Sequence, residues 1–83
     1  MLKAEINVTL KNTVSDPQGL TIKGALESLG YKGLRDVRSG KFLVVRLNYR
    51  DKKRAEREVE EMCKKLLANP IIEKYNFRIK EDK

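Results

Sequence analysis

Apolar and polar residues alternate strictly near the start of the chain. Positions 4, 6, 8 and 10 carry alanine, isoleucine, valine and leucine, with polar residues between them. A period of two predicts a strand with one buried face. Residues 41–49 predict a stronger strand, because apolar residues alternate on one face while the opposite face is also partly apolar. Apolar side chains on both faces make this strand a candidate for self-association, through Phe42, Leu43, Val44 and Val45.

Two other segments show the period of a helix. The first has apolar residues at 22, 25, 26 and 29, begins between Pro17 and Thr21, and is ended by Gly30. The second follows Asp51, which predicts an N-cap, and ends at Asn69-Pro70. Its apolar stripe is predicted to contain Ala55, Val59, Met62, Cys63 and Leu66.

Shorter patterns complete the chain. Residues 35–38 predict a short strand, followed by a tight turn at Ser39-Gly40, and residues 75–79 predict a last strand. Residues 80–83 are expected to form a frayed tail. The element order is therefore β-α-β-β-α-β in one α+β domain spanning residues 1–83. The economical packing is an antiparallel sheet with both helices on one face.

Length and charge favour a protein that works with partners. A chain of 83 residues forms only a modest core, and domains of this size often gain stability by oligomerising. The formal net charge of +7 admits acidic proteins, nucleic acids or phosphorylated ligands as partners. No apolar run approaches the length needed to span a bilayer, and no signal peptide is evident. One unpaired cysteine fits a reducing compartment, so we expect a cytoplasmic protein with no membrane contact.

The residues needed for common catalytic chemistry are missing. The chain has no histidine, which removes the commonest general base and metal ligand. Neither common phosphate-binding glycine motif is present, and no base is evident beside any serine. Cys63 falls on an apolar stripe, which predicts a buried thiol rather than a nucleophile. We therefore expect a chain that performs no chemistry alone, with no catalytic, cofactor-binding or metal site.

Four short motifs have ordinary structural explanations and could also contact a partner. Asp16-Pro17-Gln18-Gly19 is typical of a helix start, and Gly40-Lys41 of a hairpin corner. Asn69-Pro70 with Glu73 is typical of a helix stop. Lys52, Lys53 and Arg54 place positive charge at a helix start, where the helix dipole disfavours it. A solvated surface is the simpler interpretation of this cluster, and an acidic partner surface is the alternative.

Taken together, these motifs resemble a known family. The ordered set comprises Leu10-Lys11, Asp16-Pro17-Gln18-Gly19, Leu29-Gly30-Tyr31, Val37-Arg38-Ser39-Gly40-Lys41 and the segment from Cys63 to Tyr75. Over almost its full length the chain resembles the small (PurS) subunit of phosphoribosylformylglycinamidine synthase. Two features depart mildly from the family pattern: the apolar run at 43–45 and the basic cluster at 52–54.

The resemblance implies a role in de novo purine biosynthesis. The complex converts formylglycinamide ribonucleotide into formylglycinamidine ribonucleotide with ATP, magnesium and glutamine, none of which this subunit is expected to bind. A glutaminase subunit releases ammonia and a large synthetase subunit consumes it. The small subunit joins the two without catalysing a reaction, and is itself a homodimer or tetramer.

Two alternatives follow from the same element order. A small basic RNA-binding module of ferredoxin-like topology would need aromatic residues exposed on its central strands, and Phe42 alone is a poor stacking platform. The main expectation is therefore no contact with nucleic acid. An acylphosphatase-like enzyme would need an arginine in its anion-binding loop, and residues 11–19 contain none.

Overall fold

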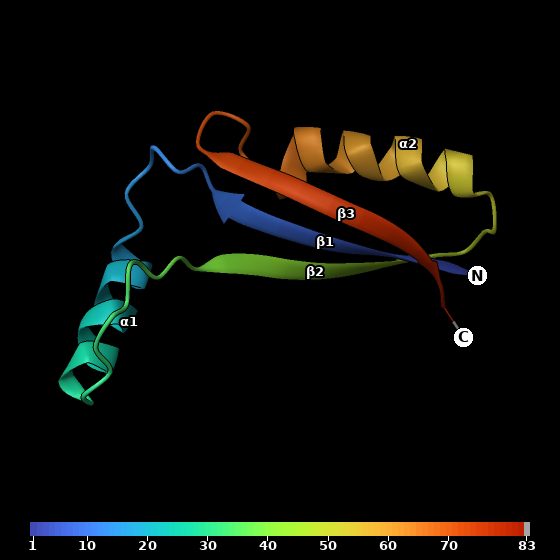
Figure 1. Cartoon of the computed structure of the whole chain (residues 1–83). Helices are drawn as coiled ribbons and strands as arrows, with labels where there is room; N and C mark the ends of the chain where they lie inside the picture. The colour runs from blue at the N-terminus through green and yellow to red at the C-terminus, as the bar shows by residue number, and fades with distance from the viewer. Residues whose placement is uncertain (83) are drawn as a thin grey trace.

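Strand β1 is the centre of the fold. The computed structural model describes residues 1–82 and contains one antiparallel sheet of three strands in the order β2-β1-β3. Along the chain the elements are β1 (Leu2–Leu10), α1 (Pro17–Ser28), β2 (Gly40–Leu47), α2 (Lys52–Met62), the π-helical turn η1 (Cys63–Leu67) and β3 (Glu73–Glu81). The molecule is elongated, with extents of 48 × 30 × 15 Å. Both termini lie at one end of the sheet (Figure 1).

The core lies between one face of the sheet and α2. The alternation in β1 directs Leu2, Ala4, Ile6 and Val8 to this face, where all four are buried. Helix α2 contributes Ala55 and Val59, and Cys63 follows them, so that one stripe of the helix covers β1 and β3. The predicted buried thiol is confirmed, since Cys63 is fully buried and burial raises its pKa.

The end of the second helix widens into a π turn. The amide of Ala68 donates to the carbonyl of Cys63 at 3.0 Å, a spacing of five residues in place of four. This extra residue rotates Leu67 towards the core and leaves Leu66 83% exposed. The prediction that Leu66 belongs to the buried stripe is therefore wrong, because the regular helical period does not continue through the π turn.

Helix α1 does not pack on the sheet. It projects from the end of the sheet opposite the termini, and residues 31–39 return beside it (Figure 1). The Lys23 Nζ atom donates to the Arg35 carbonyl at 3.2 Å, which ties the returning segment to the helix. We call residues 17–38 the arm. The prediction that both helices cover one face is wrong in this chain, because α2 alone covers it.

The predicted strand at 35–38 is also absent, although the α+β class and the antiparallel sheet are confirmed. These residues form no regular secondary structure, and their polar groups bind helix α1 and the loop that precedes it rather than a sheet edge. The guanidinium of Arg38 donates to the carbonyls of Lys11 and Val14, at 3.0 and 2.8 Å. The sheet consequently has three strands, and Ser39-Gly40 leads into β2 without forming a hairpin.

The frayed tail is wrong for residues 80–82. Lys80 and Glu81 lie within β3, and the amide of Asp82 donates to the Met1 carbonyl at 2.8 Å. Ion pairs from Lys80 to Glu5 and from Arg46 to Asp82, each 3.1 Å, hold this end. Residue 83 lies outside the described residues.

Candidate functional site

Most of the motif residues singled out in the sequence meet at one corner of the molecule. They surround a cleft of about 450 Å³ where the arm leaves the sheet. Asp16, Pro17 and Gln18 come from the start of α1, Gly40 and Lys41 from the start of β2, and Glu73 from the start of β3. The backbone amide of Gly19 contacts the Asp16 side chain. Segments far apart in the sequence therefore form one joint between arm and sheet.

Asp16 is the centre of this joint. It is the N-cap of α1, and its Oδ1 accepts a hydrogen bond from the Gly19 amide at 3.0 Å. Its Oδ2 accepts from the Ser39 amide at 2.6 Å, and the Ser39 hydroxyl lies 3.1 Å from the same oxygen. The Ser39 amide, followed by the Gly19 amide, lowers the pKa of this buried carboxyl group. Asp16 thus fixes both ends of the arm to each other.

Two glycines allow the close approaches at the joint. A Cβ atom on Gly19 would lie 2.0 Å from the carbonyl oxygen of Val37, inside the arm. A Cβ atom on Gly40 would lie 2.6 Å from the Val8 carbonyl oxygen, at the point where β2 joins β1. Gly40 therefore serves the contact between two strands rather than the predicted hairpin corner.

The turn between η1 and β3 is held by its own side chains. The Glu73 carboxylate accepts a hydrogen bond from the backbone amide of Asn69 at 2.6 Å. The side-chain oxygen of Asn69 accepts from the backbone amide of Ile71 at 3.1 Å. Lys41 Nζ donates to the Leu67 carbonyl at 3.4 Å. Asn69 and Pro70 lie outside the cleft lining. The corner is a structural joint, and its polar groups are occupied by contacts within the chain.

The basic cluster lies apart from this corner, at the end of the sheet near the termini (Figure 1). Arg54 lies 3.9 Å above the Tyr49 ring and pairs with Glu58 at 2.9 Å, while the Tyr49 hydroxyl donates to Glu58 at 3.0 Å. Arg54, then Tyr49, lowers the pKa of Glu58 through these hydrogen bonds. Lys52 and Lys53 are exposed and carry no such internal contact among residues 1–82.

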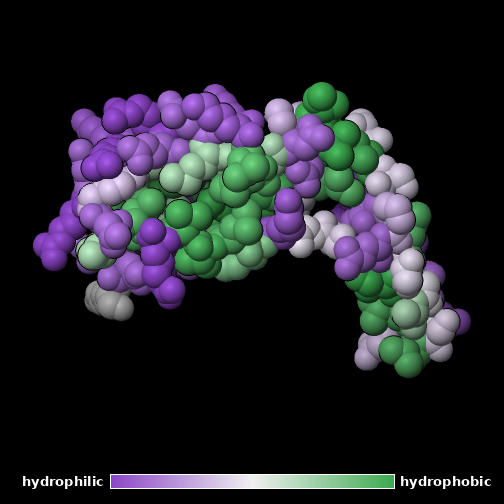
Figure 2. All heavy atoms as spheres, turned by 180° about the vertical axis from the view of Figure 1, so that it is seen from behind, coloured by the Kyte–Doolittle hydropathy of each residue, from purple (hydrophilic) through white to green (hydrophobic). Residues whose placement is uncertain are grey.

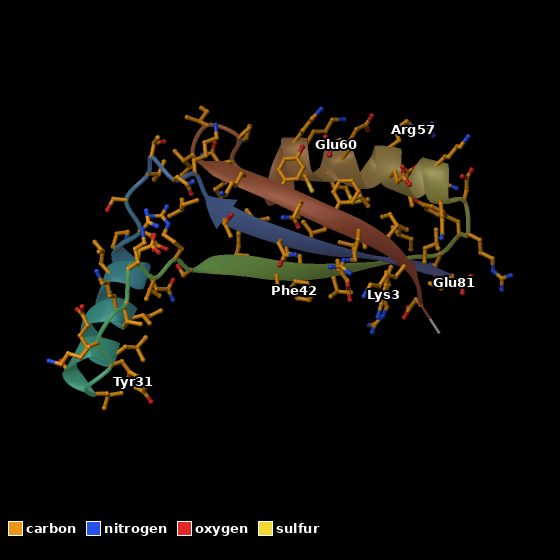
Figure 3. The ribbon with its side chains drawn as sticks, in the orientation of Figure 1. Lys3, Tyr31, Phe42, Arg57, Glu60 and Glu81 are labelled. Atoms are coloured by element: carbon orange, nitrogen blue, oxygen red, sulfur yellow. The ribbon has the colours of Figure 1, made fainter. Side chains whose placement is uncertain are left out.

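Strand β2 shows apolar side chains on both faces of the sheet, as predicted. Leu43 and Val45 are half-buried on the side of α2, whereas Phe42 and Val44 are 59% and 46% exposed on the other side. Figure 3 shows Phe42 pointing away from α2, on the same side as Lys3. We call the side that carries Phe42 and Val44 the open face.

A second hollow, beside β2, was not foreseen from the sequence. Helix α2 covers β1 and β3 and leaves a groove of about 550 Å³ next to β2, which we call the helix groove. Figure 2 shows a broad hydrophobic area there, below the polar ridge of α2. Its apolar lining is Val45, Met62, Leu66 and Leu67, and charged groups at its rim are Glu58, Glu61 and Lys65. The sequence signal for this groove was the pair of adjacent leucines at 66 and 67. Two adjacent positions of a helix point in different directions, so a narrow buried stripe takes only one of them and leaves the other exposed.

The arm also exposes apolar side chains. Leu20, Leu29 and Tyr31 are 63%, 75% and 59% exposed, and Ile22 is 38% exposed. Leu26, Leu34 and Val37 are partly buried inside the arm. The arm and the helix groove are thus two apolar surfaces that the chain does not cover by itself.

Among residues 1–82, no group of three or more histidine, cysteine, aspartate or glutamate side chains is placed to hold a metal ion. The same residues contain no helix that is both long and apolar enough to cross a membrane.

Comparison with known proteins identifies the family. The model of the PurS family, described as phosphoribosylformylglycinamidine (FGAM) synthase, matches residues 3–81. The chain is 41% identical to the Bacillus subtilis phosphoribosylformylglycinamidine synthase subunit PurS, over 98% of this chain and 95% of that one. It superimposes on the crystal structure of Methanocaldococcus jannaschii PurS with a TM-score of 0.88 at 37% identity, covering all of both chains.

A solved complex is among the similar structures. A chain of the Thermotoga maritima PurLQS structure matches with a TM-score of 0.84 at 30% identity, covering 95% of this chain and 96% of that one. The motif residues, the fold and the full-length matches agree, and the chain belongs to the PurS family of phosphoribosylformylglycinamidine synthase subunits.

Proposed function

We propose that this chain is the non-catalytic assembly subunit of a phosphoribosylformylglycinamidine synthase. In that role it joins a glutaminase to an ATP-dependent synthetase, for the glutamine-dependent amidation of formylglycinamide ribonucleotide in purine biosynthesis. The observation that carries the proposal is the match, over nearly its full length, to a chain of the PurLQS structure. ATP, magnesium and glutamine are then used by the other subunits, in the cytoplasm, and this chain needs no cofactor.

The distribution of polar groups supports an assembly role. The buried carboxylate of Asp16 is saturated by hydrogen bonds from Gly19 and Ser39, so it is not free to act as a base. Large apolar side chains are instead found on surfaces, in the helix groove and on the arm. Exposed apolar areas of this kind mark contacts with other proteins.

The uncovered surfaces also support a homo-oligomer. A conventional α+β sandwich of this type would place its first helix beside α2, over β2, and that position is the helix groove. In this chain α1 projects beyond the sheet and leaves the position open (Figures 1 and 2). We infer that α1 of a second copy fills the groove, with its apolar residues against Val45, Leu66 and Leu67.

Such an exchange is reciprocal in a dimer with twofold symmetry, so each arm covers the other copy's groove. The joint at Asp16 supports this exchange of arms, because the hydrogen bonds of Asp16 fix the arm in the projecting direction before a second copy binds. Less ordering entropy is then lost on association than for a flexible arm. A tetramer would require a second contact between such dimers.

The test is assembly from purified subunits of the same organism. The chain is mixed with the glutaminase and the synthetase, and the products are separated by size-exclusion chromatography with light scattering. We expect one species that contains all three chains and at least two copies of this one. A mixture in which the glutaminase and synthetase co-elute equally well without this chain would overturn the proposal.

A further inference from the structure

The open face of the sheet carries an unusual arrangement of charge. The strand registers place Lys3 and Glu5 of β1 on this face with Arg46 of β2 and with Lys74, Arg78 and Lys80 of β3. Glu5 is thus the only acidic strand residue among five basic ones, and it pairs with Lys80 at 3.1 Å. Arg46 pairs with Asp82. Among residues 1–82, Lys3, Lys74 and Arg78 form no salt bridge.

Apolar side chains lie beside this charge. Phe42 and Val44 are two residues apart on edge strand β2, so they project next to each other onto the open face. Asn7 and Asn76, joined by a hydrogen bond of 3.3 Å, separate Phe42 from the basic residues of β3. The open face therefore has an apolar edge on β2 and a positively charged edge on β3.

We propose that the open face is a docking surface for another protein, one that presents carboxylates to the β3 edge and an apolar side chain to Phe42 and Val44. The inference rests on the proposed function, within which the occupant is an acidic surface of a partner subunit. Charge complementarity selects that occupant: Lys3, Lys74 and Arg78 form no salt bridge within residues 1–82, and the single carboxylate of Glu5 is paired with Lys80, so carboxylates of a partner would balance the excess positive charge.

The same charges disfavour two other occupants. Two copies of this chain cannot meet open face to open face without bringing like charges together. A single-stranded nucleic acid would meet Glu5 at the centre of the face, and Phe42 is the only aromatic side chain that the registers place there. Sequence-tolerant binding of single strands uses several stacking aromatics along a basic groove.

The open face and the helix groove lie on opposite sides of the sheet. Leu43 and Val45 point to the side of α2, and Phe42 and Val44 to the other side. One copy of the chain can therefore receive the arm of a second copy in its groove while its open face contacts a different subunit. The helix groove then serves self-association, and the open face serves attachment to another subunit.

The test measures binding of surface variants to the partner subunits. Phe42→Thr removes the exposed ring, and the double variant Lys74→Thr with Arg78→Thr removes two positive charges with a residue that favours strands. Two matched controls make the same kinds of change at other exposed positions: one removes an apolar side chain, and the other removes two positive charges. Ile71→Thr alters an apolar side chain that is 80% exposed, and Arg57→Gln with Lys64→Gln removes one arginine and one lysine charge from exposed positions of α2 and η1.

We expect Phe42→Thr to raise the dissociation constant for the partner subunits about tenfold. The double neutralisation should slow association about tenfold at low salt and flatten its salt dependence. Both controls should bind as the wild type does. Light scattering should show an unchanged homo-oligomer for every variant, which separates the open face from the helix groove.

Three results overturn the inference, and they are distinguishable. If the wild-type chain forms no complex with the partner subunits, the proposed function fails and this inference with it. If the complex forms but the open-face variants bind like the controls, only this inference fails. It also fails if the wild type binds a single-stranded oligouridine at physiological salt and the open-face variants lose that binding, because the occupant is then RNA.

Discussion

Replacement of Leu66 by glutamine tests the groove that α1 of a second copy is proposed to fill. Leu66 is 83% exposed in one chain, so its loss should leave the core and the folded monomer almost unchanged. Glutamine is a good helix former, which limits any effect on the turn that contains it. Burying an exposed leucine contributes about 1–2.5 kcal/mol. A twofold dimer contains the contact twice, so dissociation should become easier by about 2–5 kcal/mol.

Sedimentation velocity over a range of concentrations measures this change directly. The expected rise in the dimer dissociation constant is between about thirtyfold and several thousandfold. Ile71→Gln is the matched control, since Ile71 is 80% exposed but does not line the groove. Equal dissociation constants for Leu66→Gln, Ile71→Gln and the wild type would refute the placement of the second copy's arm in this groove.

Three further predictions concern the joint and the core. Gly19→Ala should destabilise the fold by about 1–3 kcal/mol in urea, because its Cβ atom would meet the Val37 carbonyl, whereas Gly24→Ala, with nothing within 4 Å, should stabilise it by up to about 1 kcal/mol. The pKa of Asp16 in the folded chain lies below its ordinary 3.8, so its ionised carboxylate contributes to the free energy of unfolding above that pH, and the contribution is lost as the pH falls through the folded pKa. In acid unfolding followed by circular dichroism, the stability of Asp16→Asn should therefore fall less steeply with decreasing pH than that of the wild type. An unchanged curve would contradict this. Cys63 should react with a thiol reagent only as fast as the chain unfolds, and rapid labelling under native conditions would contradict its burial.

Hydrophobic periodicity and helix-capping residues correctly predicted several elements. The period of two in β1 and the caps at Asp16 and Asp51 appear in the structure as the sequence indicated. The motif residues around Asp16, Gly40 and Glu73 were each singled out as candidate contacts, and the structure brings them to one corner. What the sequence did not reveal was their mutual role, because Ser39 completes the joint from a distance of 23 residues.

The three misses have different physical causes. Residues 35–38 were predicted to form a strand, but the guanidinium of Arg38 binds carbonyls of the preceding loop and keeps residues 35–38 away from the sheet. The apolar stripe of α1 indicates that the helix packs against something, yet a sequence does not specify which copy of the chain supplies the surface. Leu66 was misplaced because a π turn changes the helical period, whereas the prediction continued the regular period through residues 63–67.

The most direct test of the assembly role compares two nitrogen donors in the reconstituted enzyme. Glutaminase and synthetase of the same organism are assayed for formylglycinamidine ribonucleotide formation, with glutamine or with ammonium, in the presence and absence of this chain. We predict that omitting the chain abolishes the glutamine-dependent rate and spares most of the ammonia-dependent rate, because the chain supplies geometry and no reacting group. Equal glutamine-dependent rates with and without the chain would contradict the account.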